Sequence, residues 1–334
     1  MQKFCINYST IFAIKLISDY LNKLCLPSAD DYSNLLVKAA LGTYVETISN
    51  RADSLHYHLY ERSEEELMDS FVSCVRPISR SLRLFSVEVG VDITEENFYG
   101  KSPSPWIHPW TGERGIEGRF QYLVMFVLHR NKKIPFFVCP VHLGANKAKM
   151  VKSGINVART IFRRIKLMLF DRGFYNAQLI KMLQEERIPY LIFVPKVGEF
   201  PNMLEAVEEI ATLKYTIVTN WDRSTQRVDT NIVLIREVDG YNWIFSTNID
   251  LGYGENYVRA YRQRWRVETN FRVHDEARIK SKSVRYVVRL FYFIVSLLMM
   301  TIWIKDKFGK MPFKAFIIGW YDEIHKQKIL QRTA

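Results

Sequence analysis

The sequence predicts an α/β protein, with a mixed β-sheet flanked by helices, a helical N-terminal region and a β-rich insertion. Three strand-like runs follow one another between residues 84 and 143, and a strand, a helix and a second strand follow at 167–196. Short apolar runs typical of strands return between residues 199 and 250. Residues 1–80 show apolar positions at helical spacing and no strand pattern.

Composition and charge narrow the classes of function. The 334 residues carry a formal net charge of +12, which favours a polyanionic partner such as nucleic acid or an anionic membrane surface. The four cysteines lie far apart without a CxxC pair, so neither a zinc site nor a disulfide scaffold is indicated. We therefore expect reduced thiols and a cytoplasmic protein. The only histidines near one another, His56 and His58, do not indicate a metal site.

The N-terminal region is expected to consist of several helices. The first ends at Pro27, and the next begins at Asp30 and continues to about residue 41, before Gly42. A further helix is predicted over residues 63–74, because three glutamates precede its apolar residues and acidic groups favour a first helical turn.

The central region is expected to form the sheet. Strands are predicted at residues 84–94, where Asp92 closes the strand, and at 120–130 and 134–143, which have hairpin spacing. A helix over 145–166 precedes a short buried strand that ends at Asp171. The helix and strand that follow predict parallel pairing through a crossover.

Four units follow from this pattern. Residues 1–80 form the helical N-terminal region and residues 84–198 the first part of the core. Residues 199–252 form the β-rich insertion, and residues 253–334 form a C-terminal helical part. One helix is expected to run from Tyr257 to about residue 307.

Three carboxylates stand out by their positions. Asp92 and Asp171 each end a predicted buried strand, and Glu268 lies on the long C-terminal helix. Side chains at neighbouring strand ends converge readily, and carboxylate oxygens favour Mg²⁺ or Mn²⁺ over zinc. Two such ions support phosphoryl transfer. An aspartate at a strand end is also a common turn former or helix cap, which is the structural alternative for each.

The segment around Glu268 is strongly basic. Residues 257–289 contain ten Arg and Lys residues against three acids, an excess suited to phosphate contacts. At helical spacing Tyr261, Arg264, Glu268 and Arg272 share one face. A solvated basic helix with surface ion pairs is the alternative.

Tyr261, Arg264 and Glu268 resemble the Y-(2)-R-(3)-E signature of DDE transposases of insertion-sequence family four. The segment DRGFYN around Asp171 resembles the second-aspartate segment of that family, and VDITEENFYG around Asp92 resembles the first. The resemblance covers about residues 84–305.

This resemblance implies an RNase H-like core in which Asp92, Asp171 and Glu268 hold two Mg²⁺ or Mn²⁺ ions. The implied reaction is hydrolysis at the ends of a mobile DNA element, followed by attack of the freed 3′-hydroxyl on target DNA. Tyr261 and Arg264 would bind phosphates beside the scissile bond, and residues 1–80 would read the element ends. The expected assembly is a homodimer on DNA, associated with the nucleoid.

One position departs from the family pattern. The family has a lysine seven residues after the glutamate, where this chain has Asp275; Arg272, Arg278 or Lys280 could supply the phosphate contact instead. A decayed, inactive DNA-binding remnant is therefore an alternative. A further alternative is a membrane-associated protein anchored by residues 290–304, although this apolar run of 15 residues is shorter than the ~20 that span a bilayer. We expect no membrane association.

Overall fold

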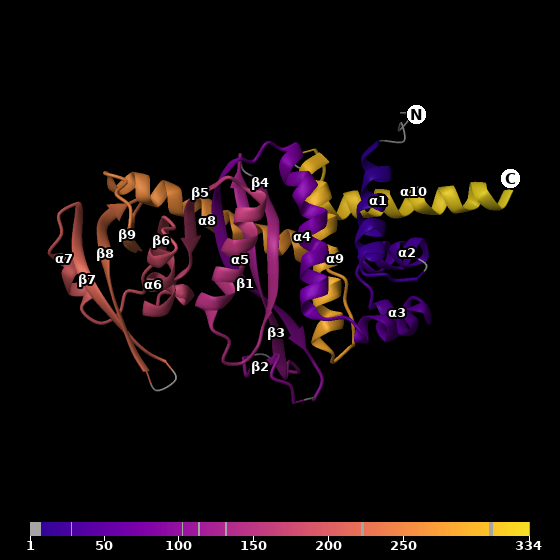
Figure 1. The fold of residues 1–334 in the computed structure, drawn as a ribbon, viewed down its shortest axis with the longest axis horizontal. Helices are drawn as coiled ribbons and strands as arrows, with labels where there is room; N and C mark the ends of the chain where they lie inside the picture. The colour runs from indigo at the N-terminus through magenta and orange to yellow at the C-terminus, as the bar shows by residue number, and fades with distance from the viewer. Residues whose placement is uncertain are drawn as a thin grey trace.

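The computed structural model describes residues 8–27, 29–101, 103–112, 114–130, 132–221, 224–306 and 310–333, without the side chains of 8–14, 221, 265–272 and 327–333. The sheet runs from a helical end to a β-rich end of the molecule (Figure 1). The N-terminal helices gather around α9 at one end of the sheet, and β7 to β9 lie at the other end.

The N-terminal region is helical, as the sequence predicts. It comprises α1 (Tyr8–Lys23), α2 (Ala29–Ala39), the 3₁₀ turn η1 (Val45–Thr47), α3 (Arg51–Tyr60) and α4 (Glu64–Ser81). Ser63 caps α4: its hydroxyl accepts from the backbone N–H of Glu66 at 3.1 Å, and the Glu66 carboxylate accepts from the N–H of Ser63 at 2.7 Å. Helix α3 was not expected, because polar residues interrupt its buried positions, although Ala52, Leu55 and Leu59 have helical spacing.

Helix α9 (Tyr286–Asp306) forms the centre of the helical end. Every residue from Val287 to Ile304 is buried, and helices α1, α3, α4 and α10 (Phe313–Thr333) pack against it. Among the described residues, α9 is the one helix long and apolar enough to cross a membrane, and its apolar window is fully buried in the structure. Core packing therefore accounts for the hydropathy that motivated the membrane alternative.

The expected single helix from Tyr257 to about residue 307 is wrong. Helix α8 (Gly254–Asp275) ends at Asp275, and α9 begins only at Tyr286. The chain between them pairs with the N-terminal region: the N–H of Val45 donates to the carbonyl of Lys280 at 3.0 Å. This long-range pairing gives the linker partners that a helix would otherwise supply.

Within the described residues the strands form one nine-stranded sheet in the order β2-β3-β1-β5-β6-β9-β8-β7, with β4 also paired to β3. The first five strands are β1 (Ser86–Phe98), β2 (Ile107–Pro109), β3 (Gly118–His129), β4 (Lys132–Val141) and β5 (Arg164–Phe170). The other four are β6 (Tyr190–Phe193), β7 (Ile210–Trp221), β8 (Ser224–Val238) and β9 (Tyr241–Thr247).

The pairing confirms the expected mixed sheet. Strands β1, β3 and β4 are antiparallel neighbours, and β1, β5 and β6 are parallel. Helix α6 (Ala177–Glu185) makes the crossover from β5 to β6. The order β4-β3-β1-β5-β6, with β3 antiparallel to its neighbours, is compatible with an RNase H-like core.

The two faces of the sheet carry different helices. Helix α5 (Lys147–Ile161) packs on one face, where Gly154 approaches Met125 and Phe137 so closely that an added Cβ would meet the Met125 side chain. Met125 pairs with Val91, so both point to that face. The next residue of β1, Asp92, therefore points to the opposite face, where α8 lies.

The β-rich segment extends the same sheet. Strand β9 pairs antiparallel with β6, placing Ile192 opposite Ser246, and β8 and β7 follow outward. A small second core, which includes Val194, Phe200 and Ile244, joins this segment to α7 (Phe200–Glu205). The division at residues 84–198, 199–252 and 253–334, with its N-terminal unit 1–80, remains a prediction.

Candidate active site

The register of two parallel strands brings Asp92 and Asp171 together. Strands β1 and β5 pair as far as Val91 opposite Phe170, and each aspartate is the next residue of its strand. Asp171 follows the end of β5, as predicted. Asp92 does not close its strand, because β1 continues to Phe98; it lies where β1 extends beyond β5. The two positions are thus neighbours at the end of the parallel pairing.

Each carboxylate is held by nearby backbone. Asp171 is the N-cap of the 3₁₀ turn η2 (Arg172–Phe174) and accepts from the N–H of Gly173 at 2.5 Å. Asp92 accepts from the N–H of Ile93 at 2.9 Å, and its side chain is 13% exposed. Asp171 is therefore a turn cap, which was the structural alternative for this residue. The same hydrogen bond fixes the direction of its carboxylate.

Helix α8 supplies a buried cation to the same place. Nη1 of Arg264 donates to Oδ2 of Asp92 at 3.3 Å, and Nε of Arg264 donates to the hydroxyl of Tyr261 at 3.2 Å. The Arg264 side chain is only 3% exposed. Tyr261 is fully buried, with its ring centre 5.4 Å from that of Phe193 and 5.2 Å from that of Phe245. In this arrangement Tyr261 positions Arg264 against Asp92.

The pKa values report the same cluster. Burial raises the pKa of the Tyr261 hydroxyl above its ordinary value, Arg264 opposes this rise, and Asp171 and Asp92 add to it. Burial alone would lower the pKa of Arg264, but Tyr261, Asp92 and Asp171 together raise it. Arg264 therefore stays charged and acts electrostatically on both aspartates.

Lys147 is a further member of the site that the sequence did not indicate. It is the first residue of α5, and its Nζ donates to the carbonyl of Gly173 at 2.9 Å. Burial lowers the pKa of Lys147, and the nearby charge of Asp171 opposes that shift. No spacing in the sequence connects Lys147 with Asp171; only the packing of α5 beside β5 brings them together.

The third predicted acid lies on α8, but its side chain is outside the described part of the chain, as is that of Arg272. The backbone places position 268 one helical turn after Arg264. Among the described side chains, no group of three His, Cys, Asp or Glu residues could hold a metal ion. Asp92 and Asp171 offer oxygen ligands only, which suits Mg²⁺ or Mn²⁺.

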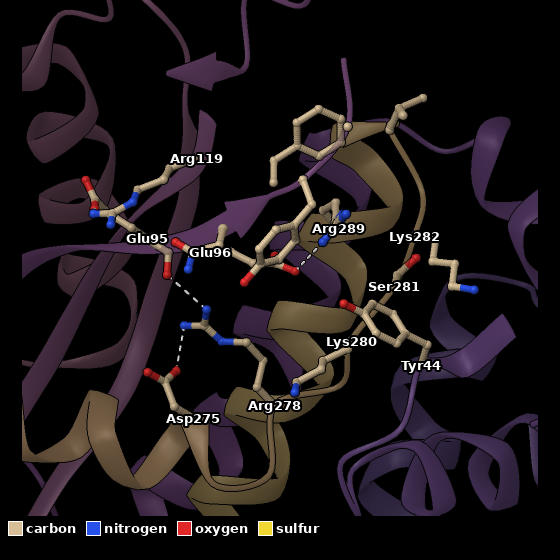
Figure 2. Close-up of a pocket in the computed structure, with 15 residues that line it drawn as sticks. Tyr44, Glu95, Glu96, Arg119, Asp275, Arg278, Lys280, Ser281, Lys282 and Arg289 are labelled. Atoms are coloured by element: carbon tan, nitrogen blue, oxygen red, sulfur yellow. Dashed lines mark hydrogen bonds and ion pairs between the residues drawn. The ribbon is translucent and has the colours of Figure 1, made fainter. Parts of the chain in front are cut away.

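The resemblance to the transposase signature calls for a lysine at position 275, where this chain has Asp275. A neighbouring arginine neutralises this carboxylate. The carboxylate pairs with Nη2 of Arg278 at 2.7 Å, and Nη1 of Arg278 donates to the carbonyl of Glu95 at 2.9 Å (Figure 2). Burial would raise the pKa of Asp275, but His274 and Arg278 lower it below its ordinary value. Asp275 is therefore ionised and paired, and Lys280 lies exposed just beyond it.

The fold and the site define an α/β protein with a mixed sheet and two neighbouring aspartates where the pairing of β1 with β5 ends. The fold is similar to the solved structure described as "Cryo-EM structure of piggyBac transposase synaptic complex with hairpin DNA", with a TM-score of 0.57. The two chains are 13% identical, and the match covers 99% of this chain and 83% of that one. No curated protein is significantly similar in sequence.

The chain belongs to the family described as "Transposase DDE domain", which matches residues 102–303, more than half of the sequence. The matched range contains Asp171 and Glu268 and begins after Asp92. The assignment of Asp92 therefore depends on strand register and on its contact with Arg264.

Proposed function

We propose that this chain is an active DNA transposase that cleaves DNA at the ends of a mobile element and joins the freed ends to target DNA. The observation that carries the proposal is the register that sets Asp92 beside Asp171, with Arg264 bound to Asp92 at 3.3 Å. Membership of the DDE transposase family supports the reaction class.

Asp92, Asp171 and Glu268 are the proposed ligands for two Mg²⁺ or Mn²⁺ ions, which when bound would activate an attacking oxygen and stabilise a leaving oxygen at phosphorus. The chain's own groups prepare this arrangement. The N–H of Gly173 fixes the Asp171 carboxylate, and Arg264 holds Asp92 in place through Oδ2. Tyr261 in turn fixes Arg264 through its hydroxyl.

The residues proposed to contact DNA differ in their exposure. Arg278 and Lys280 border an open cavity, whereas Tyr261 is buried and would act through Arg264. Arg272 would add a phosphate contact from α8. Residues 1–80 are proposed to contact the element ends, and two copies of the chain are proposed to assemble on two ends in the nucleoid. The Y-(2)-R-(3)-E spacing supports membership of insertion-sequence family four.

The test is metal-dependent cleavage of a supercoiled plasmid that carries the DNA flanking this coding sequence on both sides. The purified chain should cut this plasmid in Mg²⁺ or Mn²⁺ and not in EDTA. Asp92→Asn, Asp171→Asn and Glu268→Gln should each lower the cleavage rate by about 10³-fold or more, because each removes a charged ligand.

Asp250 offers a matched control. It lies in the turn after β9, three residues beyond Thr247, and it accepts from the N–H of Gly252 at 2.8 Å in the same pattern as Asp171 accepts from the N–H of Gly173. Asp250→Asn removes a turn-capping carboxylate that is not among the proposed ligands and should leave cleavage at the wild-type rate. If the site variants cleave as fast as Asp250→Asn, the assignment is wrong.

The second candidate function is a DNA-binding remnant without catalytic activity. The observation that favours it is Asp275, which reverses the charge of the family pattern. Its pairing with Arg278 at 2.7 Å shows how the chain accommodates that change. Binding of the same plasmid without any metal-dependent cleavage would support the remnant; cleavage and joining would exclude it.

A further inference from the structure

A cavity of about 610 Å³ lies apart from the paired aspartates. Its walls are the last residues of β1, the linker between α8 and α9, and Tyr44 of the N-terminal region (Figure 2). Glu96 borders it, four residues after Asp92 on the same strand and therefore about 13 Å further along, at about 3.3 Å per residue. The volume is in the range of small-molecule sites.

Long-range hydrogen bonds fix the linker wall. One carboxylate oxygen of Glu46 accepts from the hydroxyl of Ser281 at 2.5 Å and from the N–H of Lys282 at 2.7 Å. The N–H of Val45 donates to the carbonyl of Lys280 at 3.0 Å. These hydrogen bonds fix the backbone of the linker at Lys280 and Lys282, so the backbone that carries these two side chains is held in place without a ligand.

The acids of the cavity are already neutralised. Glu95 pairs with Arg119, and Glu96 accepts from Nη1 of Arg289 at 2.6 Å. Asp275 pairs with Arg278 at 2.7 Å. Three arginines thus offset three carboxylates.

Two cations remain. Lys280 and Lys282 are exposed, and within the part of the chain that the structure describes neither has a carboxylate at ion-pair distance. The cavity therefore has an excess of positive charge at the linker wall, which suits a phosphate group.

Two tyrosines line the same cavity as these lysines. The Nζ of Lys282 is 5.7 Å from the ring centre of Tyr44, which is half-buried. Tyr99, the residue after the end of β1, also lines the cavity and is 60% exposed. Exposed rings beside cations bind single-stranded nucleic acid, because an unpaired base offers a free face for stacking whereas a base in a duplex is covered by its neighbours.

We propose that this cavity binds one nucleotide of a single DNA strand, with its phosphate at Lys280 and Lys282 and its base against Tyr99. The inference rests on the proposed function in that DNA is the substrate, but it needs neither metal nor cleavage. The proposed single-strand subsite lies at the end of β1, beyond the paired aspartates.

The experiment measures binding of a fluorescein-labelled oligothymidine of about 12 nucleotides to the full chain in EDTA, by fluorescence anisotropy over a range of KCl concentrations. The double variant Lys280→Ala/Lys282→Ala should weaken binding about tenfold at low salt. It should also reduce the slope of log K against log salt by about 0.7, because the two lysines neutralise one phosphate of a single strand. Tyr99→Ala should weaken binding about tenfold and leave the slope unchanged, because stacking releases no counterions.

Two controls match these changes. Lys196 is an exposed lysine whose Nζ lies 3.6 Å from the ring centre of Tyr241, and neither residue lines the cavity, so Lys196→Ala removes one lysine charge beside a tyrosine elsewhere. Tyr253 is 77% exposed at the N-cap of α8 and does not line the cavity, so Tyr253→Ala matches Tyr99→Ala. Both controls should bind as the wild type does.

The proposal is overturned if the lysine variant keeps the wild-type salt slope, or if Tyr99→Ala binds the oligothymidine like Tyr253→Ala. It is also overturned if Tyr99→Ala weakens binding of a blunt duplex as much as binding of the single strand. The binding measurements need neither metal nor cleavage. If the plasmid is not cleaved but the binding differences are observed, the proposed function is wrong and the cavity proposal stands.

Discussion

Arg264 and Asp92 are 172 positions apart in the sequence, and their side chains meet at 3.3 Å in a nearly buried hydrogen-bonded ion pair. The pair joins helix α8 to strand β1 on the face of the sheet opposite α5. This ion pair is one of the contacts between the C-terminal helix and the central strand.

Replacement of Arg264 should reveal this role. Arg264→Ala leaves Asp92 largely buried without its cation, so the free energy of unfolding should fall by about 3 kcal/mol. Arg262→Ala is the control on the same helix, because its partner Asp239 is 52% exposed and such pairs contribute less than about 1 kcal/mol. Urea denaturation of both variants checks the difference. Equal losses would show that burial of the Arg264 pair adds nothing.

Tyr261→Phe should separate positioning from packing. The substitution keeps the ring among Phe193, Trp243 and Phe245 but removes the hydroxyl that accepts from Nε of Arg264. We expect a loss of about 1 kcal/mol in the free energy of unfolding. The rate of plasmid cleavage should fall about tenfold, as for a misplaced charged group. Arg264→Ala/Tyr261→Phe should then cleave no more slowly than Arg264→Ala alone. A further fall in the double variant would give Tyr261 a role independent of Arg264.

The buried pair of Glu96 and Arg289 should be important for stability. Both side chains are 10% exposed or less, and Glu96 also accepts from the hydroxyl of Tyr122 at 3.1 Å. Glu96→Ala leaves Arg289 charged in the core, so we expect a loss of about 3–5 kcal/mol. Asp31→Ala breaks the pair of Asp31 with Arg51, which is about half exposed, and should cost less than about 1 kcal/mol. Chemical denaturation distinguishes the two, and similar losses would contradict the prediction.

His56 should make stability depend on pH. Its Nε2 lies 2.8 Å from the hydroxyl of Tyr292, and burial lowers its pKa below the ordinary value, while Glu46 and Asp53 oppose this shift. The unfolded chain therefore takes up the proton at higher pH than the folded chain. Stability from this group is complete above about pH 6.5 and is lost as the pH falls towards the lower folded pKa.

The measurement is the free energy of unfolding of wild type and His56→Gln between about pH 7.5 and 5. Other buried histidines, such as His274, also have lowered pKa values, so the comparison is between slopes. The wild type should lose stability more steeply, by up to about 1.4 kcal/mol per pH unit. Parallel curves would mean that His56 has the same pKa in the folded and unfolded chain.

Local patterns predicted much of the fold. Alternating or continuous apolar residues gave the positions of β1, β3, β4, β5 and β6, and the acid-rich start after Ser63 gave the beginning of α4. Local patterns failed where long-range contacts decide. The linker after Asp275 is held by Val45 and Glu46, and nothing near residues 276–285 in the sequence shows those partners.

For the candidate site too, local sequence patterns predicted some features and long-range contacts decided the others. The sequence by itself determined that Asp92 and Asp171 accompany buried strands, and that Tyr261 and Arg264 share a helix face with position 268, because spacing fixes what one strand or one helix presents. Only the tertiary structure decided that β1 and β5 pair in the register that makes the two aspartates neighbours. It also decided that Arg264 contacts Asp92, that Lys147 lies beside η2, and that Glu46 holds the cavity wall. These contacts join segments that are far apart in the chain, so they form only when the chain folds and the segments pack into one core.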